Sequence, residues 1–193
     1  MKRWHVLDAL IKRNGFKSVV ELGIWKGATM APLLALNPDI KYIGIDLYAP
    51  QPDGECETYL PDDNGHAWDH EAYYDNAMRI VEAHPNATVI RDYTTAPEVL
   101  DSIPAGSIDL VFIDADHSYT GARADIDAWL TKIRPGGIIC GHDYCNDFPG
   151  VMEAVDESFA GRVKLYDDTV WAVVVSENDN ECCIPDRNKH NST

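Results

Sequence analysis

Short apolar runs rich in β-branched residues recur along this chain, and between them apolar side chains return every three or four positions. The short runs predict buried strands, which we place at 17–22, 40–46, 87–90, 108–113, 138–140, 162–166 and 170–175. The longer periodicity predicts helices, which we place at 3–13, 27–36, about 74–81, about 126–133 and 151–159. Strands alternating with helices are typical of a doubly wound parallel α/β sheet, which we expect to form one domain over residues 1–176.

Turn-forming residues set several of these boundaries. In the first helix Leu7, Leu10 and Ile11 share one face, and an Asn-Gly pair at 14–15 predicts its end. The second helix contains Pro32, which a helix tolerates only near its first turn. That helix therefore either starts late or bends at the proline.

A helix is predicted after the fourth strand. Its apolar positions follow i, i+3, i+4 and i+7 spacing, at Ile126, Trp129, Leu130 and Ile133. An Arg-Pro-Gly-Gly sequence at 134–137 predicts a turn into the next strand. Asp125 and Asp127 on the same helix are expected to be solvated.

Two stretches break the alternation of strands and helices. Residues 49–70 combine Pro, Gly and many acids with interspersed aromatic residues. A loop this long in a small domain is either a lid over a substrate or an acidic solvated excursion, and the aromatic residues favour the lid. Residues 177–193 are polar and without periodicity, which predicts a disordered tail.

Composition narrows the class of protein. The 193 residues are 45% hydrophobic, enough for one buried core, and no apolar run approaches the ~20 residues of a membrane span. The N-terminus meets Asp8 before any signal-type apolar region develops, so we expect a cytoplasmic protein without membrane contact. The five cysteines lack the paired spacing of a zinc module or disulfide framework, which indicates reduced thiols.

The net charge bears on possible partners. Sixteen basic against 32 acidic residues give a charge of −16, which disfavours a nucleic-acid backbone as substrate. A cationic or neutral small molecule is not excluded. The sequence leaves open whether the chain forms a homo-oligomer.

The stretch Val19–Gly27 is the first with a chemical signature. A β-branched run ends at Glu21, and Gly23 and Gly27 follow before a helical segment. A glycine bend lets the backbone approach a ligand, and the next helix directs free N–H groups toward it. Because Ile24 and Trp25 occupy the turn, it lacks the Gly-x-Gly-x-x-Gly pattern that accommodates a pyrophosphate. The turn instead suits a nucleoside that carries a positive charge.

Other strand ends add contacts for such a nucleoside. Asp46 ends the second strand at the spacing usual for an acid that binds ribose hydroxyls, with Leu47 beside it. The glycine pattern resembles motif I of class I S-adenosylmethionine-dependent methyltransferases. In that fold the turn after the third strand borders the adenine, which makes Asp92 and Tyr93 further cofactor-binding candidates.

Two acids mark the ends of the fourth and fifth strands. If these strands are neighbours, their carboxyl ends lie about 5 Å apart, so Asp114 and Asp143 can point into one cleft. Paired carboxylates must share a proton or a cation, and Mg²⁺ suits such oxygen ligands. His142 would add a nitrogen ligand and shift the preference toward Mn²⁺, Fe²⁺ or another transition metal.

Three motifs of the second half carry a more specific resemblance. The sequences Asp-Ala-Asp-His-Ser-Tyr at 114–119, Arg-Pro-Gly-Gly at 134–137 and Gly-His-Asp-Tyr at 141–144 are similar to those of cephalosporin-hydroxylase-type and macrolide sugar O-methyltransferases. A more distant likeness is to catechol and caffeoyl-coenzyme A O-methyltransferases. The resemblance extends over about residues 17–175.

The resemblance implies both a fold and a metal site. The fold is the three-layer, doubly wound, Rossmann-like class I methyltransferase sheet, with strand order 3-2-1-4-5-7-6 and the last strand antiparallel. In metal-dependent members an acid at the Asp114 position and polar or acidic residues at 142–143 bind Mg²⁺. His142 departs from the acid found there, which leaves metal dependence open.

The expected reaction is transfer of the sulfonium methyl group to an oxygen of a small hydroxylated substrate, such as a sugar. Asp114 would contact cofactor and metal, and His117 is either the general base or a hydrogen-bonded turn residue. Asp116 would support His117 or the metal. The alternatives are a non-catalytic module that binds the nucleoside cofactor and, less favoured by the glycine turn, a nicotinamide-dependent oxidoreductase.

Overall fold

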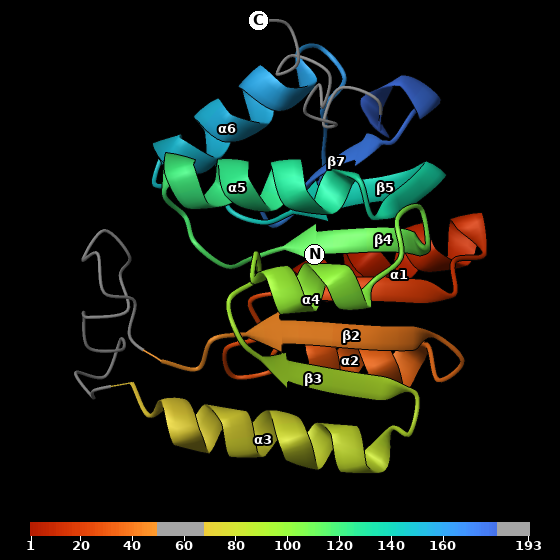
Figure 1. The fold of residues 1–193 in the computed structure, drawn as a ribbon, viewed down its shortest axis with the longest axis vertical. Coiled ribbons are helices and arrows are strands. Elements are labelled where there is room, and N and C mark those ends of the chain that lie inside the picture. The colour runs from red at the N-terminus through yellow and green to blue at the C-terminus, as the bar shows by residue number, and fades with distance from the viewer. Residues whose placement is uncertain (50–67, 181–193) are drawn as a thin grey trace, which may run out of the picture.

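A mixed β-sheet of seven strands forms the middle layer of the molecule (Figure 1). The computed structural model describes residues 1–49 and 68–180. The strands are β1 (Ser18–Leu22), β2 (Lys41–Asp46), β3 (Ala87–Arg91), β4 (Ile108–Ile113), β5 (Ile133–Gly141), β6 (Lys164–Leu165) and β7 (Trp171–Val174). Their order is β3-β2-β1-β4-β5-β7-β6, and β7 runs antiparallel to both neighbours, which confirms the predicted topology.

Helices cover both faces of this sheet (Figure 1). They are α1 (Arg3–Asn14), α2 (Met30–Leu36), α3 (His70–Ala83), α4 (Pro97–Ser102), α5 (Tyr119–Leu130) and α6 (Pro149–Phe159). The apolar side chains of α1, α2 and α3 pack on one face of the sheet, and those of α4, α5 and α6 on the other. This arrangement explains why nearly every residue of β1 and β4 is buried, because a central parallel strand is covered on both faces.

Several boundaries differ from the pattern-based expectation. Helix α2 starts late, at Met30, so Pro32 lies in its first turn and no bend is needed. Helix α4 was not predicted, because its six residues are too few to establish a period. Residues 177–180 form a short 3₁₀ helix where a disordered tail was expected. The remainder of that tail and residues 50–67 of the predicted lid lie outside the described residues.

The prediction was also wrong at the end of α5. The helix ends at Leu130, and Ile133 pairs instead with Ile108 as the first residue of β5. The next pair in the register is Leu110 with Ile138, so the Arg-Pro-Gly-Gly segment forms a bulge within the strand rather than a turn before it.

The carboxyl ends of the parallel strands meet at one edge of the sheet. Backbone hydrogen bonds continue past the strand ends, from Gly23 N to Ile45 O (2.9 Å), from Asp114 N to Leu22 O (2.8 Å) and from His142 N to Ile113 O (3.0 Å). The residues that follow β1, β2, β4 and β5 are thereby held side by side. In the described part of the chain, no helix is both long and apolar enough to cross a membrane.

Candidate functional site

The glycine turn after β1 requires its unusual backbone. Gly23 has a φ of +83°, and a Cβ at this position would overlap the carbonyl oxygen of Asp114. Gly27 has a φ of +75°, and a Cβ there would lie 2.9 Å from the side chain of Ile80. Trp25 holds a positive φ of 49° without being glycine, and its side chain is 38% exposed. The turn is therefore locked against β4 on one side and α3 on the other.

Asp46, at the end of β2, holds this turn in place. Its Oδ2 accepts hydrogen bonds from the backbone N–H groups of Ile24 and Trp25, both at 2.8 Å, and its Oδ1 accepts one from Tyr48 N at 2.8 Å. A carboxylate has about four acceptor positions, so capacity for a ligand hydroxyl is left. Leu47, the residue beyond Asp46, is half-buried.

Asp92 and Tyr93 follow β3 at the same edge. The backbone N–H of Asp92 donates to the Asp46 carbonyl oxygen at 3.2 Å, which places the two strand ends together. The Asp92 carboxylate accepts a hydrogen bond from Tyr93 N, and the Tyr93 side chain is 49% exposed. These two predicted cofactor contacts therefore share one edge of the sheet with Asp46.

Glu21 is placed differently from the other predicted cofactor contacts. Its side chain is buried on the sheet face, where Oε2 accepts a hydrogen bond of 2.5 Å from the Tyr42 hydroxyl of β2. Burial raises the pKa of Glu21 to about 8, although the bond from Tyr42 opposes that rise. Burial thus favours the protonated form of Glu21, and its side chain binds Tyr42.

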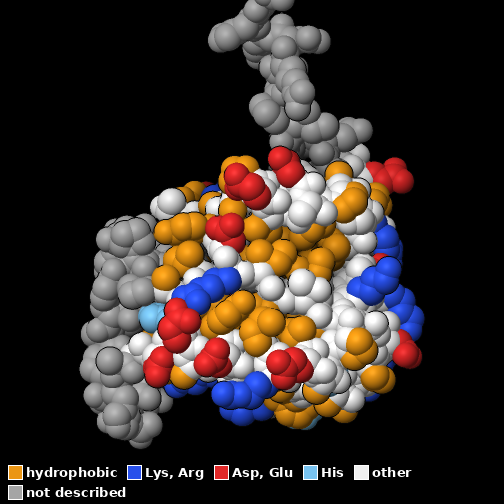
Figure 2. Space-filling model, turned by 60° about the horizontal axis from the view of Figure 1, so that its bottom comes forward, with side chains coloured by type: hydrophobic (Ala, Val, Ile, Leu, Met, Phe, Trp, Pro, Cys, Tyr) orange, Lys and Arg blue, Asp and Glu red, His pale blue; other side chains and the backbone are white. Residues whose placement is uncertain are grey.

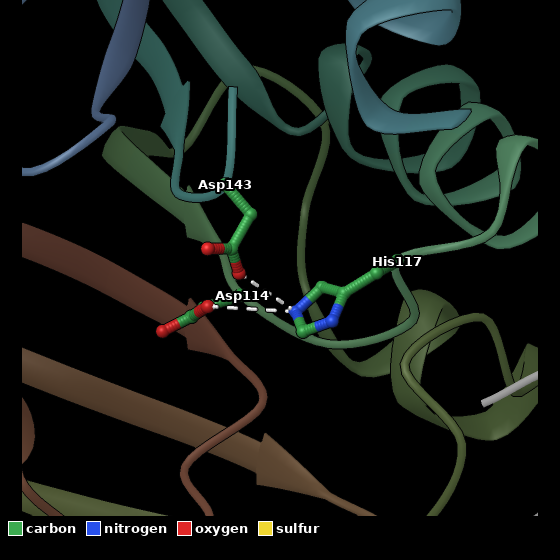
Figure 3. Close-up of side chains that lie close together, drawn as sticks. All are labelled: Asp114, His117 and Asp143. Atoms are coloured by element: carbon green, nitrogen blue, oxygen red, sulfur yellow. Dashed lines mark ion pairs between the residues drawn. The ribbon is translucent and has the colours of Figure 1, made fainter. Parts of the chain in front are cut away.

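A second group of side chains lies at the ends of β4 and β5 (Figure 3). His117 Nε2 is 2.9 Å from Asp143 Oδ2 and 3.9 Å from Asp114 Oδ1. His142 Nδ1 is 2.8 Å from Asp143 Oδ1 and 3.6 Å from Asp114 Oδ1. Asp143 has a positive φ of 61°, a conformation that Asp tolerates better than most residues. The predicted convergence of Asp114, His142 and Asp143 is present, and His117 joins them.

These groups stabilise one another's charged forms. Burial lowers the pKa of His117, but Asp114 and Asp143 outweigh it and raise the pKa to about 10. Burial raises the pKa of Asp143, but His117 and His142 outweigh it and hold the pKa well below its usual value. Around neutral pH an imidazolium therefore lies between two carboxylates, and in this form His117 donates a proton rather than accepting one.

The group also has the composition of a cation site. One ligand atom each from Asp114, His117 and Asp143 lies within 4.8 Å of the others. The Nε2 atoms of both histidines are buried; that of His117 faces Asp143 at 2.9 Å, whereas that of His142 has no hydrogen-bond partner among the described residues. Two carboxylates and an imidazole nitrogen fit a divalent ion that accepts mixed nitrogen and oxygen ligands.

Tertiary structure brings in residues that the motifs did not identify. Arg3, on α1, places its Nε 2.7 Å from Thr29 Oγ1 and 3.3 Å from Asp114 Oδ2. Asp168, in the β6–β7 turn, accepts a hydrogen bond from Arg3 N at 2.7 Å and lies 4.0 Å from His142 Nε2. The only sequence signal for Arg3 was a basic residue at the start of a helix, which is common on surfaces.

Three further acids in this region have structural roles. Asp116 accepts a hydrogen bond from Ser118 N at 2.8 Å and so shapes the loop that carries His117. Asp127 is half-exposed and pairs with Arg123, as expected for a solvated residue. The same expectation was wrong for Asp125, which is buried and accepts a 2.5 Å hydrogen bond from Thr94.

Sequence comparison bears directly on this arrangement. A family model described as a methyltransferase domain matches residues 20–144, more than half of the chain. The chain belongs to this methyltransferase family. The match begins within β1 and ends just beyond Asp143, so it contains the glycine turn and both strand-end acids.

Solved structures of methyltransferases share the fold. CalS11, a TDP-rhamnose 3′-O-methyltransferase of calicheamicin biosynthesis, is 15% identical with a TM-score of 0.67 and aligns over 89% of this chain and 77% of its own. A caffeoyl-CoA O-methyltransferase-like protein from Staphylococcus aureus is 12% identical with a TM-score of 0.61, over 90% of this chain and 82% of that one. These likenesses confirm the class I methyltransferase architecture.

One curated relative gives only a short alignment. It is the uncharacterised protein y4gI of Sinorhizobium fredii, 37% identical over 49 residues. The aligned part is 25% of this chain and 5% of that protein.

Proposed function

We propose that this methyltransferase transfers the methyl group of S-adenosylmethionine to a hydroxyl oxygen of a small molecule, with a sugar as the leading acceptor class. One observation supports this function above the others. The glycine turn of β1 and the Asp114–His117–Asp143 group lie at adjoining strand ends and touch through Gly23 and the Asp114 backbone. A cofactor seated on the turn would therefore face that group.

The residues around the turn fit a nucleoside with a cationic centre. The Asp46 carboxylate retains acceptor capacity for ribose hydroxyls, and Asp92 and Tyr93 stand beside it. Trp25 fills the turn where a pyrophosphate binder needs glycine, which disfavours a nicotinamide cofactor. When bound, S-adenosylmethionine would supply an electrophilic methyl group to a hydroxyl oxygen of the acceptor. The products would be the methyl ether and S-adenosylhomocysteine, with the hydroxyl proton passing to solvent water.

Asp114, His117 and Asp143, with His142 beside them, would hold a divalent cation. Such an ion lowers the pKa of an acceptor hydroxyl and orients it. His117 can be a general base only when neutral, and the two carboxylates favour its protonated form. We therefore assign His117 to the ion-binding group, where a cation would replace the proton between the carboxylates.

The first test compares cofactors and acceptors. We expect S-adenosylhomocysteine to raise the melting temperature of the protein by several degrees at saturation, and NAD to leave it unchanged. A panel of sugar and catechol acceptors is then assayed for methyl transfer. Stabilisation by NAD alone would overturn the proposal, and cofactor binding without transfer to any acceptor would favour the non-catalytic alternative.

The same assay tests the ion site. We expect chelation to lower methyl transfer and Mn²⁺ to restore it, because the donor set includes imidazole. Asp143→Asn should lower the rate about 100-fold or more. Asp127→Asn, a surface substitution outside the site, is the control and should retain full activity. Activity that is unaffected both by chelation and by Asp143→Asn would remove the ion from the proposal.

A further inference from the structure

Arg3 occupies the junction between the glycine turn and the end of β4. Its Nε donates to Thr29 Oγ1, at the N-terminal end of α2, and lies 3.3 Å from Asp114 Oδ2. Thr29 is buried, whereas the Arg3 side chain is 25% exposed. The guanidinium is thus fixed at one nitrogen and still accessible to a ligand.

The two terminal nitrogens of Arg3 are uncommitted. Within residues 1–49 and 68–180, neither Nη1 nor Nη2 donates a hydrogen bond, and the closest contact of the guanidinium with Asp114 is through Nε. A guanidinium group that is held at Nε and open at its two terminal nitrogens can bind a carboxylate through two parallel hydrogen bonds, because the group is planar. The backbone N–H of Arg3 donates a hydrogen bond to Asp168 Oδ2, which also fixes the position of the Arg3 backbone.

We propose that Arg3 binds the α-carboxylate of the methionyl part of the cofactor. This inference rests on the proposed cofactor and adds the residue that recognises its amino-acid end. A cofactor whose ribose lies at Asp46 and whose sulfonium faces Asp114 extends its amino-acid part over the glycine turn, toward Arg3 and Thr29. The charges match as well, because acids face the cationic sulfur and a cation faces the carboxylate.

The nearby cations are committed elsewhere. Lys26 Nζ lies 4.1 Å above the ring of Trp25 and 5.2 Å above that of Tyr73. Arg91 binds Glu71 and the Tyr48 carbonyl oxygen. The imidazoles of the ion-binding group face Asp114 and Asp143. Among the described residues, Arg3 is therefore the cation with open donors near the amino-acid end.

The test uses two ligands that differ in the amino-acid part alone. S-adenosylhomocysteine carries the α-carboxylate, and 5′-methylthioadenosine has the same nucleoside thioether without it. We expect Arg3→Met to weaken binding of S-adenosylhomocysteine by about 10- to 100-fold and that of 5′-methylthioadenosine by less than about threefold, measured by calorimetry. Arg3→Lys should retain part of the affinity, because a lysine makes one of the two bonds.

Arg13→Met on the exposed end of α1 is the control and should bind both ligands normally. Equal losses for both ligands in Arg3→Met would show that Arg3 only shapes the end of β4 and would overturn the inference. Unchanged affinity for S-adenosylhomocysteine would overturn it too. If the unmodified protein binds neither ligand, the proposed cofactor itself is wrong. This outcome differs from a failure of the Arg3 inference, in which the unmodified protein still binds S-adenosylhomocysteine.

Discussion

Gly23 and Trp25 both hold a positive φ in the turn after β1, but under different constraints. Two constraints exclude a side chain at Gly23: its positive φ disfavours any residue with a Cβ, and that Cβ would overlap the carbonyl oxygen of Asp114. At Trp25 the strained conformation is held by the hydrogen bond that its N–H donates to Asp46. The motif predicted the glycine, whereas the strained tryptophan is visible only in the structure.

This difference gives a test with an internal control. Gly15 also has a positive φ, of +67°, but a Cβ there would meet no atom within 4 Å. We expect Gly15→Ala to cost about 1–2 kcal/mol of unfolding free energy, because only the backbone is strained. Gly23→Ala should cost roughly 3 kcal/mol or more, because the added Cβ also displaces the Asp114 backbone. Urea unfolding measures both, and equal losses would contradict the clash.

At the scale of elements, α5 anchors the loop that follows β3. Asp125 accepts a hydrogen bond from the Thr94 hydroxyl, and Trp129 Nε1 donates to the Thr94 carbonyl oxygen at 2.9 Å. The loop that carries Asp92 and Tyr93 is therefore positioned by a helix packed on the sheet. Burial raises the pKa of Asp125 to about 7, and the bond from Thr94 only partly offsets this.

Asp125 makes the stability of the fold dependent on pH. Its folded pKa lies above the unfolded value of 3.8, so its contribution is fully present below pH 4 and is lost as pH rises through about 7. Asp125→Asn retains an acceptor for Thr94 and cannot ionise. We expect this variant to be more stable than the parent at pH 8 by roughly 1–4 kcal/mol, and equal to it near pH 4.

Asp127→Asn on the same helix is the matched control, because Asp127 is half-exposed. Denaturant unfolding between pH 4 and pH 8 should give it the same profile as the parent. A parallel offset of Asp125→Asn at every pH would contradict the assigned titration.

At the scale of the whole molecule, the net charge of −16 is the dominant electrostatic feature. On the face turned forward in Figure 2, acidic and basic side chains lie among hydrophobic ones rather than in one continuous patch. A large excess of one sign destabilises the compact state through self-repulsion, and salt screens it.

We therefore expect NaCl to stabilise this protein near neutral pH. Raising its concentration from about 10 to about 200 mM should raise the melting temperature at pH 7.5 by about 2–5 °C, measured by calorimetry. The gain should shrink at pH 5, close to the isoelectric point of about 4.6, because the excess charge is largely lost there. A melting temperature that falls with salt at pH 7.5 would show that ion pairs outweigh self-repulsion.

Most of the fold could be predicted from the sequence, because the pattern of apolar residues within a short segment indicates whether it forms a buried strand or an amphipathic helix. The failures were local. The α5–β5 boundary was misplaced, since Ile133 suits the helical spacing and the strand equally well. Helix α4 is too short to show a period. The order of the strands came from the resemblance of the motifs to a known family.

By itself, the sequence determined which residues end the parallel strands, and therefore that a glycine turn, Asp46, Asp114 and Asp143 share one edge of a sheet. Only the tertiary structure decided that Glu21 is buried against Tyr42 and that Arg3 reaches this edge from α1. The physical reason is the separation along the chain between the residues in contact. Periodicity shows which side of its own helix or strand a residue lies on, whereas contacts between distant segments depend on how the elements pack.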